Sequence, residues 1–206
     1  LKGPSSTAAE FEAMMNRVGA ATGATAEQMA VLTNEAREQG RTTAFTATQS
    51  ASALEMLAKN GLTYEQIVGG ASDATLKLAA STGSELSDAA DLATDVIKNF
   101  KMETSELGDA VDGIVGVTLQ SKFTFDDYRL ALAQAGGVAG TVGVTLEDFN
   151  AAIAVTSSLF ASGSDAGTSY KTFLMRLVPQ SKKAAAMMKE LGLEFFDSNG
   201  QMKDMA

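Results

Sequence analysis

Residues 40–61, GRTTAFTATQSASALEMLAKNG, contain the pattern from which we predict the fold of this chain. Thr46 is placed to cap a helix, and Gln49 completes a capping box, in which each side chain bonds the other residue's backbone N–H group. The apolar residues that follow lie along one helical stripe. Asn60-Gly61 ends the helix, because glycine adopts the left-handed conformation after a helix at little cost. This stretch therefore predicts a short amphipathic helix with a defined start and stop.

The same starting device recurs along the chain. A threonine is followed three residues later by a glutamine or an acid, which is typical of a capped helix start. The further pairs are Thr25/Gln28, Thr63/Gln66, Thr124/Asp127 and Thr145/Asp148. We therefore predict an all-α fold, a compact multi-helix domain of about ten short helices.

Glycines supply most of the expected stops. We expect one helix from about Ala26 to Gln39, ended by Gly40, and another from about Phe125 to Ala135, followed by a glycine-rich turn over 136–143. Near the C-terminus, Asn199-Gly200 lies between extended-looking flanks, which predicts a small β-hairpin over 193–203. The sequence opens at Leu1 without Met and ends in mid-pattern, so we expect a piece of a longer chain.

Composition excludes several classes of function. The chain has 16 basic and 25 acidic residues, a net charge of −9, and no basic cluster, so we expect no nucleic-acid binding. It has no Cys, which excludes a disulfide framework and a cysteine metal site. It also has no His, which removes the commonest general base and the commonest metal ligand. We predict no cofactor site.

Acidic residues are the remaining candidates for catalysis. Asp88, Asp91 and Asp95 share a helix face, and Asp126-Asp127 and Glu147-Asp148 are adjacent pairs. Each group lies at a predicted helix start, where the helix dipole favours acids, so we interpret them as solvated helix starts. We predict no catalytic residue and no metal site.

Two further patterns leave alternatives open. The only charges in residues 130–164 are Glu147 and Asp148, which fits a buried helical hairpin at the centre of the fold or a membrane-active hairpin. Burial in protein is favoured, because each helix is too short to span a bilayer. Residues 45–61 and 123–143 also echo each other, and we interpret the echo as recurring capping chemistry rather than duplication.

A series of small motifs follows a fixed order along the chain. Its structural motif positions include Thr25, Gly40, Phe45, Thr46, Gly61, Gly163, Ala166, Gly167, Thr168 and Arg176. In their order and spacing these motifs resemble the conserved N-terminal-side helical region of phage tail tape-measure proteins. The resemblance covers nearly the whole chain and departs from the family at Tyr170-Lys171 and over residues 46–49.

The resemblance implies a structural virion protein whose length sets tail length and which is released during genome delivery. It implies partners among tail-tip or baseplate and tail-tube proteins, and a homo-oligomer such as a trimer or a hexamer. It also implies a location in the virion tail and, during assembly, in the host bacterial cytoplasm.

Physical reasoning narrows the role within such a protein. A measuring rod needs long, uninterrupted helix, because a helix rises only 1.5 Å per residue. Caps and glycines interrupt this chain every twenty residues or so, so we expect the whole of 1–206 to be a compact assembly or anchoring domain. The alternative is a membrane-active helical module with transient membrane contact that helps the genome through the cell envelope. An acid-only hydrolase ranks third.

Overall fold

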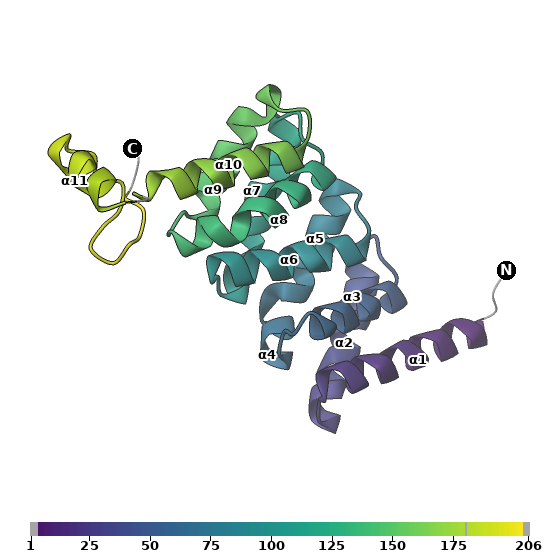
Figure 1. Cartoon of the computed structure of the whole chain (residues 1–206). Coiled ribbons are helices and arrows are strands. Elements are labelled where there is room, and N and C mark those ends of the chain that lie inside the picture. Colours follow the sequence, from purple (N-terminus) through teal and green to yellow (C-terminus); the bar gives the residue numbers. More distant parts are fainter. Residues whose placement is uncertain (1–3, 180, 204–206) are drawn as a thin grey trace. The chain divides into compact units, whose positions relative to one another are not determined.

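The computed structural model describes residues 4–179 and 181–203, and every regular element in them is helical (Figure 1). The predicted all-α class is confirmed. The elements are α1 (Pro4–Thr22), α2 (Ala26–Thr42), α3 (Ala47–Lys59), α4 (Tyr64–Gln66), η1 (Ile67–Ala71), α5 (Ser72–Thr82), α6 (Leu86–Phe100), η2 (Thr104–Glu106), α7 (Leu107–Gln120), α8 (Phe125–Thr141), α9 (Leu146–Thr156), η3 (Ser157–Leu159), α10 (Gly163–Leu177) and α11 (Lys182–Glu190).

The helices group into two compact units. Unit 1 contains the described residues up to Ile97 together with Met102–Asp112, and unit 2 contains Lys98–Lys101 and the described residues from Gly113 onward. Each unit has its own buried apolar core. The expectation of one conserved domain over 1–206 stays a prediction.

In unit 1, α3 is the central helix and packs against both α1 and α2. Its apolar stripe, with Leu54 and Leu57, is fully buried. The capping box that opens α3 is confirmed: Gln49 N–H donates to Thr46 Oγ1 at 3.2 Å, and Thr46 N–H donates to Gln49 Oε1 at 2.8 Å. Gly61 takes the left-handed conformation after the helix, with φ of 94°.

The other predicted starts are also confirmed. The threonine hydroxyl accepts a bond from the backbone N–H three residues on, and in three of the four cases the reciprocal bond completes the box. These starts are Thr25/Gln28, Thr63/Gln66, Thr124/Asp127 and, without the reciprocal bond, Thr145/Asp148. Local capping chemistry therefore sets where these helices begin.

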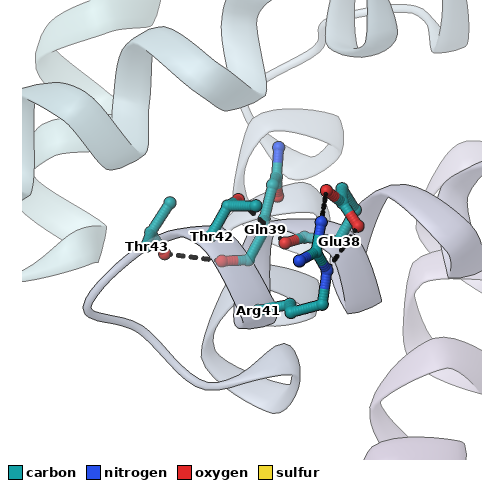
Figure 2. A network of polar contacts seen from close by, with 5 residues as sticks. All are labelled: Glu38, Gln39, Arg41, Thr42 and Thr43. Atoms are coloured by element: carbon teal, nitrogen blue, oxygen red, sulfur yellow. Dashed lines mark hydrogen bonds and ion pairs between the residues drawn. The ribbon is translucent and has the colours of Figure 1, made fainter.

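The predicted stop at Gly40 is wrong, because α2 continues through it to Thr42. Figure 2 shows the true end, where the Arg41 guanidinium pairs with the Glu38 carboxylate and the Thr43 hydroxyl donates to the Gln39 carbonyl. Gly40 instead permits close approach: a Cβ there would lie 2.4 Å from the backbone nitrogen of Ala47. The start of α3 fills the space that a side chain would need.

In unit 2, α8 packs along α10 and also contacts α9. The core of this unit is aromatic: the Phe149 ring lies 5.7 Å from Phe100, 6.2 Å from Tyr128 and 5.8 Å from Tyr170, measured between centroids. The Tyr128 hydroxyl donates to Asn150 Oδ1 at 2.6 Å, so this buried polar pair is satisfied within the core.

The predicted glycine-rich turn over 136–143 is also wrong in most of its length. Helix α8 runs to Thr141, and only Gly143, with φ of 82°, has the left-handed conformation of a stop. A Cβ on Gly140 would lie 1.7 Å from the carbonyl oxygen of Asn99. Glycine therefore lets the last turns of α8 lie directly against the backbone at the end of α6, and this packing offsets its poor helix propensity.

The predicted β-hairpin over 193–203 is not formed. Within the described residues there is a single antiparallel bridge, between Phe196 and Met202, and no strand. The Asp197 N–H donates to the Gln201 carbonyl at 2.8 Å around the predicted Asn199-Gly200 turn. Met202 N–H then donates to the Val142 carbonyl at 2.6 Å, which ties this segment to the α8–α9 turn.

Candidate interaction surface

The Gly163-to-Thr168 block of the sequence forms the first turns of α10, where that helix lies closest to α8. Ala166 is 1% exposed. A Cβ on Gly163 would lie 1.7 Å from the Asp127 carbonyl oxygen, and one on Gly167 would lie 2.5 Å from the Ala131 carbonyl oxygen. Small residues at i and i+4 thus let the two helix backbones touch. The block serves packing within unit 2.

Asp127 joins the same two helix starts. Its Oδ2 accepts from the Thr124 N–H and hydroxyl, and its Oδ1 accepts from the Gly163 N–H at 3.0 Å. Burial opposes ionisation of this carboxyl, but the bonds from Gly163 and Thr124 outweigh it and hold the pKa of Asp127 below its usual range. Asp127, one member of the Asp126-Asp127 pair, therefore uses both of its carboxylate oxygens to cap helix starts.

The other predicted motif positions have separate places. Thr25 and Thr46 are exposed caps, Gly61 is a helix stop and Phe45 is half-buried, all in unit 1. Thr168 and Arg176 lie exposed on α10 in unit 2. The structure brings Gly163, Ala166 and Gly167 together in one seam and assigns the remaining positions mainly to local helix geometry.

An apolar groove lies beside this seam, between α9 and α10. It has a volume of about 600 Å³ and is lined by Ala151, Val155 and Phe160 on one side and by Ala166, Tyr170 and Phe173 on the other. Val155 is 79% exposed and Phe173 is 47% exposed. An apolar hollow with such exposed large side chains is typical of a surface that binds another helix or protein.

One carboxylate stands at the groove. Asp148 is the charged residue among the described groove-lining residues, and its Oδ2 accepts from the Thr145 hydroxyl at 2.9 Å. Burial, with a smaller contribution from Asp148, raises the pKa of the Tyr170 hydroxyl. The Tyr170 hydroxyl therefore stays neutral, and the negative charge at the groove comes from Asp148.

The sequence pointed to this region without identifying the groove. The weakly charged segment 130–164 contributes one wall, but it is neither wholly buried nor uniformly exposed: Phe149 and Ile153 are buried, whereas Val155 and Leu159 face outward on the same chain segment. Helix α9 is therefore amphipathic, with one face in the core and the other, which carries Val155, exposed.

Metal-binding and membrane-spanning features are both absent from the described residues. No group of three or more acidic, His or Cys side chains there is arranged to hold a metal ion. Among the described helices, none combines the length and the hydropathy that crossing a bilayer requires.

Comparisons with known proteins agree with the resemblance. The chain is 31% identical over 193 residues to a tape measure protein of Pneumococcus phage Dp-1, which covers 94% of this chain and 17% of that protein. It is 29% identical over 176 residues to a probable tape measure protein of Escherichia phage P2, which covers 85% of this chain and 22% of that protein. The chain thus spans about a fifth of the length of these curated relatives. No solved structure matches it.

A family model also matches most of the chain. The model described as phage-related minor tail protein matches residues 33–206, which include four of the five threonine-capped starts and the α8–α10 seam. The resemblance to phage tail tape-measure proteins is confirmed, and the chain belongs to the phage-related minor tail protein family.

Proposed function

We propose that this chain is a compact assembly or anchoring segment of a tape-measure protein, which sets tail length and is released during genome delivery. The segment acts by binding, without catalysis. Family membership supports the tail-protein class, and the apolar groove between α9 and α10 supports a binding role.

The shortness of the helices is the observation that carries the compact role. The longest helix within residues 4–179 and 181–203 is α1, with 19 residues, which corresponds to about 29 Å. Drawn out as one helix, the 206 residues would span about 310 Å. The capped starts and left-handed glycine stops instead fold that length into two compact units.

Partners and location follow from the same proposal. The segment contacts tail-tip or baseplate and tail-tube proteins in the virion tail, and it meets them first in the host bacterial cytoplasm during assembly.

Deletion of the segment tests the compact role. One variant of the full-length tape-measure protein would lack residues 1–206. The matched control would lack the same number of residues from the longest predicted helix of that full-length protein. We expect the control to give tails shorter by about 310 Å, and the segment deletion to block tail assembly. Intact tails that are shorter by that length after the segment deletion would contradict the proposal.

Electron microscopy of intact tails would locate the segment directly. A tag at its N-terminal end should mark compact density at one end of the tape. Density for the segment drawn out along the tube lumen would reject the compact role.

The membrane-active alternative has its own measurement. The purified chain would be added to dye-loaded vesicles, with an amphipathic membrane-lytic peptide as the positive control. Dye release by the chain at comparable concentrations would favour the alternative, and intact vesicles are the outcome that the assembly proposal expects.

A further inference from the structure

Helix α11 and the groove between α9 and α10 are complementary surfaces of one chain. No residue of α11 is buried. Met187 on α11 is 58% exposed, and Leu191, the C-cap residue four positions later, is 69% exposed on the same side. An amphipathic helix with an uncovered apolar face gains stability when a groove covers that face.

The dimensions of the two surfaces match. The groove follows residues 148–156 of α9 and residues 166–173 of α10, about two turns on each side, or about 12 Å. Helix α11 has nine residues and is about 13 Å long. It can therefore lie along the groove with both apolar residues of its exposed face inside.

Their charges are also complementary. Helix α11 carries Lys182, Lys183, Lys189 and Glu190, a net charge of 3 − 1 = +2, within a chain of net charge −9. Asp148 stands at the groove, and Glu147 precedes it on the same helix. Lys183 lies four residues before Met187 and therefore on the same face, so it is the cation that can approach Asp148 when this face enters the groove.

No residue of α11 lines the groove of its own chain. A linker of four residues, 178–181, separates α11 from α10. Beyond α11, the Met202 N–H is bonded to the Val142 carbonyl at the α8–α9 turn, and Lys203 pairs with Glu194 at 2.9 Å. The adjoining side of α11, with Met188, lines a hollow together with Leu193 and Phe196 of this segment. The exposed Met187 face is left for another molecule.

We infer that α11 of one copy docks in the α9–α10 groove of a second copy of this chain. Such a contact is heterologous, because two different surfaces meet. It therefore joins copies head to tail and closes into a ring when the rotation between copies permits. The inference stands on the groove and on α11 and does not rest on the proposed role in tail assembly.

Mass measurements on three variants test the inference. Val155→Asp places a charge in the groove, Met187→Asp/Leu191→Asp places charges on α11, and Leu119→Asp is the matched control, since Leu119 is 76% exposed on α7 and does not line the groove. Sedimentation velocity would be recorded up to the solubility limit, with circular dichroism confirming that each variant folds. We expect concentration-dependent association of the wild type and of Leu119→Asp, and at least about tenfold weaker association of the other two variants.

Mixing the two defective variants distinguishes the possible occupants. The Val155→Asp chain keeps a working α11, and the Met187→Asp/Leu191→Asp chain keeps a working groove. An equimolar mixture should therefore form heterodimers and nothing larger. Heterodimers absent from the mixture, a monomeric wild type, or association that both sets of substitutions leave unchanged would each overturn the inference, and would point to the chain's own α11 or to a different protein as the occupant.

Discussion

Two buried serines of unit 1 differ in whether the side-chain hydroxyl has a hydrogen-bond partner. Ser50, on α3, is fully buried, and its hydroxyl has no hydrogen-bond partner among the described residues. Ser72, at the start of α5, is 1% exposed, donates to the Glu35 carboxylate and accepts from Gln39 Nε2 at 2.7 Å. A buried polar group is costly only when it is left unpaired.

We therefore predict opposite effects of alanine at the two serines. Ser50→Ala should raise the free energy of unfolding by about 1 kcal/mol, because it removes an unsatisfied hydroxyl and improves helix propensity. Ser72→Ala should lower it by about 1 to 2 kcal/mol. Urea denaturation of both variants checks this, and a loss of stability in Ser50→Ala as large as that in Ser72→Ala would contradict it.

Glu35 supplies a prediction on pH. Burial raises its pKa, and Asp73 adds to that rise, although the Ser72 and Gln39 bonds act against it. A raised folded-state pKa means that the stability contributed by Glu35 is full below its pKa in the unfolded chain and is lost as the pH rises through its higher folded pKa. Glu35→Gln should therefore stabilise the chain at neutral pH, with the gain shrinking at mildly acid pH.

Glu38→Gln is the matched control on the same helix. The exposed Glu38 carboxylate pairs with the Arg41 guanidinium, and this pairing lowers the pKa of Glu38 (Figure 2). Glu38→Gln should therefore slightly destabilise the chain at neutral pH, opposite in sign to the effect of Glu35→Gln. Thermal unfolding across the acid-to-neutral range measures both. If the difference in stability between Glu35→Gln and the wild type were the same at every pH, the Glu35 carboxyl would not titrate in this range.

At the scale of elements, the seam between α8 and α10 depends on the absence of side chains. Gly163→Ala would place a Cβ 1.7 Å from the Asp127 carbonyl oxygen, and that backbone atom cannot rotate away. Gly116 lies in the middle of α7, and the nearest neighbour of a Cβ added there would be Gln120 Nε2, at 4.0 Å. The two glycines therefore lie in helices for different reasons.

We predict that Gly163→Ala destabilises the chain by about 3 kcal/mol or more, because α10 must move off α8. Gly116→Ala should stabilise it by about 1 kcal/mol through helix propensity alone. Guanidinium denaturation gives both values. Equal effects of the two substitutions would show that the seam adapts freely and that close approach at Gly163 is not required.

At the scale of the whole molecule, the net charge of −9 governs long-range interactions. The local charge of +2 on α11 is small beside it. We predict no binding to duplex DNA near physiological salt, because attraction to phosphates requires a basic surface. Fluorescence anisotropy of labelled DNA should stay unchanged, with a basic DNA-binding protein as the positive control. A salt-sensitive rise in anisotropy would contradict the prediction.

The sequence alone was sufficient to predict the helical class, the five threonine-capped starts and the stop at Gly61. These features are local, because a cap or a left-handed glycine involves residues only a few positions apart. The family resemblance also came from the order of such small motifs. The β-hairpin prediction was right only for its turn, which is a local feature: Asn199-Gly200 turns as expected. The flanking residues form a single bridge and no strands, because strand pairing depends on contacts that the local sequence does not reveal.

Long-range packing determines which glycines end helices and which let helices touch. Gly40, Gly140 and Gly163 lie inside helices because the backbones of Ala47, Asn99 and Asp127 occupy the space of their missing side chains. For Gly140 and Gly163 these neighbours are 41 and 36 positions away in the chain (140 − 99 and 163 − 127), so no local pattern reveals them. The groove between α9 and α10 has the same origin, since its two walls become one surface only when α10 packs on α8.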